Sequence, residues 1–273
     1  MEYDPTLFRG TAAYYVTGRP PFSRHLAATL AAECDLDGTG RLLDAGCGPG
    51  TLTLALANQF EDIVALDPDR EMLTEGMRLA ARAGLKNIQW VQGCAEEISA
   101  LGLGTFRLVT FGQSFHWTDR ERVAEMVYDS LVPGGSLAIV THTNKSRPQP
   151  EGPGYPPIPH DAIRAIIERY LGPRRRAGRG IYAQASDSHE DLLARTRFGA
   201  SYNVLCAGRD DIVQDIDAVL ANYFSTSFAA PHLFRDQLPG FEADVRAALM
   251  ASSPSHLFWD WPGDTQVLLA RKI

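Results

Sequence analysis

A glycine-rich segment at residues 42–50 constrains the fold more than any other part of the chain. The apolar run Arg41 to Ala45 is typical of a buried strand, and Thr51 to Phe60 carries apolar residues at helical spacing. Three glycines stand at alternate positions between them. Glycine is favoured where φ is positive or where a ligand lies against the backbone, and a helix amino end presents N–H groups without intrahelical partners. The segment therefore predicts a strand, a turn and a helix that together hold a small molecule.

The spacing of the glycines and the acid before them argue against a phosphate-bearing ligand. A dinucleotide pyrophosphate is held by GxGxxG, whereas this segment has GxGxG. Asp44, two positions before the first glycine, would repel a phosphate and would suit a cationic group. Two alternatives are a glycine turn without a ligand and an NAD enzyme, which the spacing disfavours.

These residues resemble the first motif of the class I (Rossmann-like) S-adenosylmethionine (SAM) methyltransferases, in which an acid precedes GxGxG. The pattern is matched by Asp44, Gly46, Gly48 and Gly50, with Cys47 between them. The resemblance extends over residues 8–145. It implies an α/β fold with a doubly wound, mostly parallel seven-stranded sheet, helices on both faces and an inserted helical cap. It also implies SAM as cofactor and S-adenosylhomocysteine as its product.

A second predicted strand, Ile63 to Asp67, ends in an acid about 20 residues after Gly46. A carboxylate at this place in a βαβ unit accepts hydrogen bonds from ribose hydroxyls. We therefore predict that Asp67, with Pro68 beside it, binds the cofactor. The alternative is an aspartate that caps the next helix, expected from Arg70 to Ala83.

The adenine is expected beyond a third strand at Ile88 to Val91. The resembled family commonly has an acid and then a small residue here, but in this chain Cys94 stands where the acid is expected. The backbone N–H of Ala95 can still meet a ring nitrogen, because that contact needs no particular side chain. Glu96 is a substitute partner for the adenine amino group.

The first 40 residues are expected to form lid helices over the cofactor. Prolines precede a helical pattern from about Phe22 to Cys34. The resemblance places Tyr15 and Arg19 near the methionyl carboxylate of SAM. The alternative for these two residues is a packed aromatic ring and a solvated arginine.

The segment after a fourth predicted strand, Phe106 to Phe111, is expected to face the substrate. Ligands of doubly wound sheets bind beyond the carboxyl ends of the strands. The sequence QSFHW at residues 113–117 resembles small-molecule methyltransferases that include the trans-aconitate enzymes. We predict Gln113 as a cofactor contact, and Phe115 and Trp117 as walls of the substrate site. Thr118 and Glu121 match a capping box for a helix ending near Leu131.

Two histidines are the predicted catalytic residues. His116 lies in the QSFHW segment, and His142 is expected just past a fifth strand at Ser136 to Thr141, which follows a turn at Val132 to Gly135. A histidine with a pKa near neutrality can take a proton from a hydroxyl or an activated carbon, whereas a carboxylate acceptor needs no base. The alternative is that either histidine only packs.

The remaining residues exceed what the sheet needs. The last two strands are expected at 200–206 and 266–271, within a single methyltransferase domain whose SAM-binding core is 41–145 and whose lid is 1–40. Residues 146–199 and 207–262 are assigned to the cap and connecting helices. Helices are predicted near 161–171, 212–222 and 241–250, and a proline-rich loop at 147–159.

One basic cluster, Arg174 to Arg179, interrupts an acidic protein. It is either a solvated loop or a site for a carboxylate or phosphate of the acceptor. The net charge of -7 and the pI near 5.5 disfavour nucleic-acid binding, which needs a basic face.

The cysteines and the amino terminus indicate a cytoplasmic protein. The four cysteines show no metal-binding spacing, so we expect a reducing compartment and no metal. The chain opens with acidic residues and has no long apolar run, so neither a signal peptide nor a membrane span is expected. The expected partner is a small-molecule substrate, for a monomer or homodimer.

The sequence thus predicts a SAM-dependent methyltransferase acting on an oxygen or carbon nucleophile of a small metabolite. Such an enzyme mainly positions the acceptor in line with the methyl group and excludes water, because the cofactor supplies the electrophile. The alternative is a SAM-binding protein of the same fold that guides a non-methylating reaction such as a cyclisation.

Overall fold

The computed structural model describes residues 4–143, 145–177, 180–181 and 187–273. A seven-stranded sheet with the order β3-β2-β1-β4-β5-β11-β8 is its central element. Its strands are β1 (Arg41–Ala45), β2 (Asp62–Asp67), β3 (Ile88–Gln92), β4 (Phe106–Gly112), β5 (Leu131–Thr143), β8 (Tyr202–Cys206) and β11 (Asp264–Arg271). The first five run parallel, and β11 is antiparallel to both neighbours. The predicted α/β fold with a mostly parallel sheet is confirmed.

Helices cover both faces of this sheet, because successive side chains of a strand point to opposite sides. Leu43 packs in one cluster with α5 (Arg120–Ser130) and α7 (His189–Leu193). Leu42 packs in the other with α2 (Leu26–Glu33) and α3 (Thr51–Leu56). Ala65, from the same side as α3, meets Leu73 of α4 (Arg70–Arg82). Both faces are therefore buried, and ligands have access only at the strand ends.

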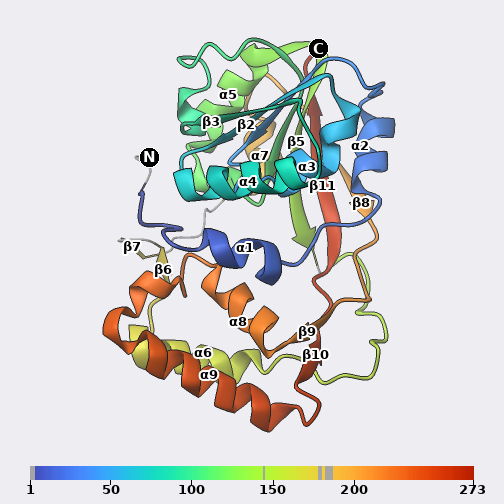
Figure 1. The fold of residues 1–273 in the computed structure, drawn as a ribbon. Coiled ribbons are helices and arrows are strands. Elements are labelled where there is room, and N and C mark those ends of the chain that lie inside the picture. The colour runs from blue at the N-terminus through green and yellow to red at the C-terminus, as the bar shows by residue number, and fades with distance from the viewer. Residues whose placement is uncertain (1–3, 144, 178–179, 182–186) are drawn as a thin grey trace.

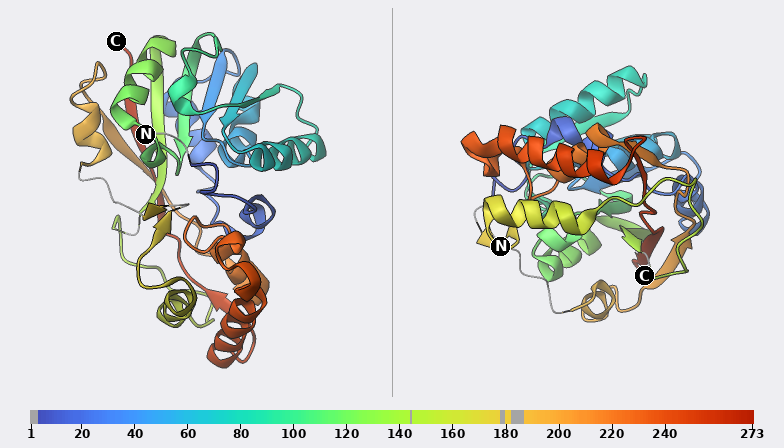
Figure 2. Two further views of the ribbon diagram at one scale, coloured as in Figure 1. Left: turned by 90° about the vertical axis from the view of Figure 1, so that its left-hand side faces the viewer. Right: turned by 90° about the horizontal axis from the view of Figure 1, so that it is seen from below.

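A separate helical layer, the cap, lies beyond the carboxyl edge of the sheet. It comprises α6 (His160–Leu171), α8 (Ile216–Phe224) and α9 (Leu238–Ser252), and α1 (Ala12–Gly18) lies between it and the sheet (Figure 1). Seen from below, α6 and α9 run side by side (Figure 2). The cap has its own apolar core, in which the rings of Phe234 and Phe241 stack with centroids 3.9 Å apart.

Gly18 allows α1 to touch the cap. A Cβ at this position would lie 2.2 Å from the backbone of Ala221 in α8, so no other residue permits this approach. The lid helix thereby contacts α8 of the cap as well as α4, which packs on the sheet. The helices expected in 146–199 and 207–262 lie in the cap, except α7, which packs on the sheet.

Two predicted helices begin later than expected. The helix predicted from Phe22 starts at Leu26, because Ser23 donates its backbone N–H to Thr265 Oγ1 instead of entering a helix. The helix predicted from residue 212 starts at Ile216. Residues 213–215 form β9 (Val213–Asp215), which pairs with β10 (Leu257–Trp259), and Asp215 then caps α8 by accepting from Ala218 N.

The capping box predicted at Thr118 is wrong. The Thr118 hydroxyl donates to the Phe115 carbonyl, and α5 begins only at Arg120. The Asp119 N–H in front of that helix instead donates to Glu96 Oε1 at 2.8 Å. Glu96, which is distant in sequence, therefore accepts a hydrogen bond at the helix amino end that the capping box was expected to satisfy.

The fifth strand is longer than predicted. Leu131 already pairs with Phe106 and Ser136 with Leu108, so residues 132–135 form an irregularity within β5. At its other end His142 pairs with Thr265 of β11 and lies inside the strand, not past it. Among the described helices, none is long and apolar enough to cross a membrane.

Candidate functional site

Two adjoining cavities lie at the carboxyl ends of β1, β2 and β4. The first, here called the Asp67 cavity, is lined by Asp67 and the segments after β2, β3 and β4. The second, the His116 cavity, has a volume of about 250 Å³ and contains both predicted catalytic histidines. Residues that line both cavities include Phe8, Tyr15, Gly46, Gly48, Gln113 and Trp117.

The three glycines of the first motif have different roles, although all have positive φ angles. A Cβ on Gly46 would lie 2.6 Å from Ser114 Cβ, and one on Gly50 would lie 2.7 Å from the Trp90 ring. At Gly48 the nearest atom would be 4.0 Å away, on Tyr15, so this glycine faces open space. Gly50 caps α3 and lines neither cavity. Only Gly46 and Gly48 thus present backbone to a ligand.

Asp67 is a buried carboxylate at the cavity wall. Its Oδ2 accepts from Gly48 N at 2.8 Å and its Oδ1 from Asp69 N at 2.8 Å. Burial raises the pKa of Asp67 to about 6 despite these hydrogen bonds. The helix cap of α4 is Asp69, which accepts from Glu71 N and Met72 N. Each oxygen of Asp67 therefore keeps a lone pair that can accept a hydrogen bond from a ligand hydroxyl, such as those of a ribose.

Asp44 contrasts with Asp67, although burial also raises the pKa of Asp44 to about 6. It accepts from the backbone N–H and hydroxyl of Thr53 and from the hydroxyl of Thr110. These bonds join β1 to α3 and β4. Asp44 lines the His116 cavity together with Cys47, another predicted cofactor contact, and it is 1% exposed.

The far end of the Asp67 cavity contains the residues predicted around the adenine. Pro68, Cys94, Ala95 and Glu96 all line it. Cys94 N donates to Glu97 Oε2, whereas Ala95 opens the short helix η2 (Ala95–Glu97), a position whose N–H has no partner within the helix. One oxygen of Glu96 is occupied by Asp119 N.

The lid helix α1 brings Tyr15 and Arg19 to the cavities. The Arg19 guanidinium lies 4.9 Å from the Tyr15 ring centroid and donates to the Ser225 carbonyl. Arg19 Nε is buried and has no hydrogen-bond partner within the described part of the chain. Because buried donors are normally paired, this atom beside the cavity suits an anionic ligand group such as a carboxylate.

The segment after β4 is strained where it meets the cavities. Gln113 lines both cavities and has a φ of 58°, which is uncommon for a residue other than glycine. Its backbone N–H donates to the Val140 carbonyl. The Trp117 ring meets the edge of Phe8 at 5.8 Å and closes both cavities on one side.

Phe115 is not a wall of the substrate site, contrary to the prediction. It is 1% exposed and packs in the sheet core, with its ring 5.0 Å from Phe111 and 5.3 Å from His189. The turn η3 (Phe115–Trp117) sends neighbouring side chains in different directions, so Phe115 enters the core while His116 and Trp117 face the cavity.

Both predicted catalytic histidines line the His116 cavity and are held neutral. Burial, reinforced by His189 and Arg175, lowers the pKa of His116 to about 4. Burial also lowers the pKa of His142, whose ring stacks on Phe22 at 4.9 Å. His142 Nδ1 is buried without a hydrogen-bond partner among residues that the structure describes.

Several residues that line the His116 cavity were not among the individually predicted site residues. Arg175 lies in the predicted basic cluster, which was the available signal, while Gly178 and Arg179 of that cluster lie outside the described residues. Thr226, Ser227 and Phe228 follow α8 and carry no recognisable motif. They reach the cavity only because the cap packs over the sheet.

Residues 42–135 match a family model described as a methyltransferase domain. The chain contains a class I SAM-dependent methyltransferase domain. It is 34% identical over 140 residues to an uncharacterized methyltransferase of Mycobacterium tuberculosis, covering 51% of this chain and 54% of that protein. It is 31% identical over 141 residues to the malonyl-[acyl-carrier protein] O-methyltransferase of Enterobacter lignolyticus, with the same coverage. The chain thus spans about half the length of the curated relatives it matches.

The solved structure of the YcgJ protein from Bacillus subtilis is similar to the methyltransferase domain and its cap together. The superposition has a TM-score of 0.52 at 15% identity and covers 91% of this chain and 98% of that one. This likeness concerns the fold alone. None of these matches singles out the trans-aconitate enzymes, so that narrower resemblance stays a prediction.

Proposed function

We propose that this chain transfers the methyl group of SAM to an oxygen or carbon nucleophile of a small metabolite, with the cap and the sheet acting as one domain. The observation that carries the proposal is the junction of the two cavities. A molecule held at Asp67 can extend past Gly48 and Trp117 into the His116 cavity, because these residues line the passage between them.

The residues of the Asp67 cavity fit SAM in kind. Asp67 would accept from the ribose hydroxyls and Ala95 N–H would meet the adenine, while the buried Nε of Arg19, which lines the adjoining His116 cavity, would meet the methionyl carboxylate. The aromatic faces of Tyr15 and Trp117 line the passage, where a sulfonium is attracted to the negative face of a ring. When bound, SAM supplies an electrophilic methyl group.

The residues of the His116 cavity would orient the acceptor. A neutral His116 can accept a hydrogen bond from a hydroxyl or donate one to an anionic oxygen, depending on its tautomer. Its lowered pKa makes it a weak base, since proton abstraction near neutral pH is most efficient for a base with a pKa near the working pH. We therefore assign His116, together with His142 in the same cavity, to positioning first and to proton removal second.

The formation of S-adenosylhomocysteine tests this function. The purified chain would be incubated with methyl-labelled SAM and candidate metabolites, and labelled product and S-adenosylhomocysteine would be quantified together. We expect the two to appear in equal amounts. A converted substrate without S-adenosylhomocysteine would favour the cyclisation-type alternative, and binding of NAD with no binding of SAM in calorimetry would overturn the proposal.

A further inference from the structure

A third cavity lies inside the cap, between α6 and α8. This cap cavity has a volume of about 400 Å³. Three of its lining residues, Arg175, Thr226 and Phe228, also line the His116 cavity, so the two cavities adjoin at these side chains. The Arg175 guanidinium lies 4.6 Å from the Phe228 ring centroid at this junction.

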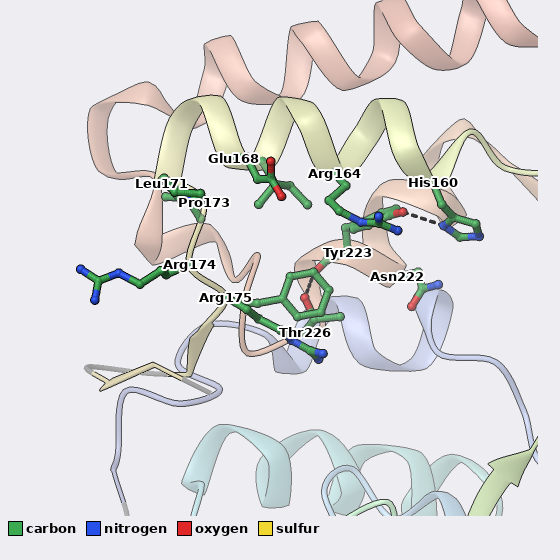
Figure 3. A pocket seen from close by; sticks show the side chains of 13 residues that line it. His160, Arg164, Glu168, Leu171, Pro173, Arg174, Arg175, Asn222, Tyr223 and Thr226 are labelled. Atoms are coloured by element: carbon green, nitrogen blue, oxygen red, sulfur yellow. Dashed lines mark hydrogen bonds between the residues drawn. The ribbon is translucent and has the colours of Figure 1, made fainter. Parts of the chain in front are cut away.

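The cap cavity is cationic in a protein whose net charge is -7. Arg164, Arg174 and Arg175 line it, against one acid, Glu168. Figure 3 shows the Arg164 head group beside Tyr223, and Arg175 on the other side of the cavity, while Arg174 extends away from it. Within the described part of the chain, the ion pair of Arg164 is with Asp161, at 3.2 Å and with both side chains mostly exposed. Such a pair contributes little, so Arg164 can turn to a ligand.

A chain of hydrogen bonds orients a hydroxyl at the wall of this cavity. Tyr223 Oη lies 2.7 Å from His160 Nδ1, and His160 Nε2 lies 2.6 Å from Asp260 Oδ2 (Figure 3 shows the first of these contacts). The chain joins α8, the first residue of α6 and the segment before β11. Burial raises the pKa of Tyr223, so its phenol stays protonated. When His160 donates from both ring nitrogens, to Asp260 Oδ2 and to Tyr223 Oη, the Tyr223 hydroxyl is held in one place and its own proton is free to donate to a ligand.

We infer that the cap cavity binds a second, anionic group of the acceptor, so that the acceptor is an organic acid reaching from the His116 cavity past Arg175 and Phe228. This rests on the proposed function. Arg164 and the Tyr223 hydroxyl bind the distal carboxylate, and Ile167, Leu171 and Phe228 line the path of its hydrocarbon. Arg175, at the junction, lies between the two ends of the acceptor.

Binding of linear dicarboxylates tests the inference. The protein saturated with S-adenosylhomocysteine would be titrated calorimetrically with dicarboxylates of increasing length and with monocarboxylates of equal length. At least one dicarboxylate should bind roughly 10- to 100-fold tighter than its monocarboxylate partner, as expected for hydrogen bonds to a charged group.

Three variants separate a binding role from a structural one. Arg164→Gln and Tyr223→Phe should each remove most of the preference for the dicarboxylate, while monocarboxylate affinity and melting temperature stay close to those of the wild type. Glu168→Gln, at a position on the same helix as Arg164, removes the acid found among the described lining residues and should increase the preference.

The outcomes distinguish this inference from the proposed function. Equal affinity for the two series, no dicarboxylate binding, or an unchanged preference in Arg164→Gln and Tyr223→Phe overturns the inference and leaves methyl transfer standing. Failure of S-adenosylhomocysteine to bind overturns the proposed function, and the inference with it.

Discussion

The loops at the carboxyl edge of the sheet and the cap contribute to the site in different ways. At the sheet, Gly46 follows β1 directly, Asp67 ends β2 and Ala95 lies shortly after β3, and much of the proposed recognition uses backbone groups. In the cap, Arg175 and Tyr223 come from segments that only tertiary packing brings together, and side chains line the cavity. A ligand site built from backbone groups requires particular residues only at glycines and turns. A ligand site built from side chains can change its specificity through single substitutions. The proposed cofactor site is therefore more tightly constrained by its backbone geometry than the proposed acceptor site.

Substituting Gly46 should impair binding at the sheet edge most strongly. In Gly46→Ala the new methyl group meets Ser114 and displaces the segment after β4. Overpacking of this kind costs about 1–3 kcal/mol, so we expect SAM affinity to fall by up to about 100-fold in calorimetry. Gly84→Ala is the matched control, because Gly84 has a similar φ but open space around it. A similar loss of affinity in both variants would contradict the steric explanation.

Asp67→Ala should weaken SAM binding by about 10- to 100-fold, since hydrogen bonds to a charged group contribute roughly 1.5–3 kcal/mol. Asp44→Asn provides the contrast. Its three hydrogen bonds come from Thr53 and Thr110, so this variant should mainly lose about 1–3 kcal/mol of unfolding free energy. Calorimetry and denaturant unfolding of both variants measure the difference. An equal loss of affinity in Asp44→Asn would show that Asp44 acts on the cofactor directly.

SAM affinity should fall by up to about tenfold per pH unit as the pH drops below about 6. The pKa of Asp67 is raised to about 6 without ligand, and hydroxyl donors favour its ionised form. Below this pH, binding must first remove a proton from Asp67. The folding stability of the free protein should change with pH in the opposite direction to SAM affinity. The raised pKa of Asp67 in the folded state adds stability at low pH, and this contribution is lost as the pH rises through about 6. Asp67→Asn should bind weakly with little pH dependence.

His116→Ala should have the smallest effect on SAM binding, leaving affinity within about twofold while lowering turnover by roughly tenfold, less than the 100-fold typical of a well-matched base. Because the pKa of His116 is about 4, its charge does not change above about pH 5. The pH profile of turnover in the neutral range should therefore be the same in wild type and variant. Wild-type turnover in His116→Ala would mean that this histidine only packs.

Much of the site at the carboxyl edge of the sheet could be predicted, because the sequence patterns that indicate it are local. Alternating glycines require positive φ angles within a few residues, and an acid at the end of the next strand lies beside them in any right-handed βαβ unit. The wrong prediction in this region, for Phe115, also concerns a local feature. Phe115 and His116 are neighbours in sequence, yet one enters the core and the other faces a cavity, which the pattern of a short turn cannot distinguish.

The helix before residue 34 and the cap of α5 show why other predictions failed. Ser23 bonds to Thr265 and Asp119 to Glu96, partners that are far away in sequence. Propensity and capping patterns describe only a segment and its neighbours, so they miss a backbone group that finds its partner across the fold.

The sequence alone determined the strand–turn–helix of residues 41–60 and the acid that follows it, and therefore the class of fold and the cofactor that we propose, because these depend on spacing along one chain segment. Tertiary structure decided that Arg175 and Phe228 adjoin the cavity of His116, and that Asp260, His160 and Tyr223 form one hydrogen-bonded chain. Their proximity comes from packing of the cap over the sheet edge, which no local spacing encodes.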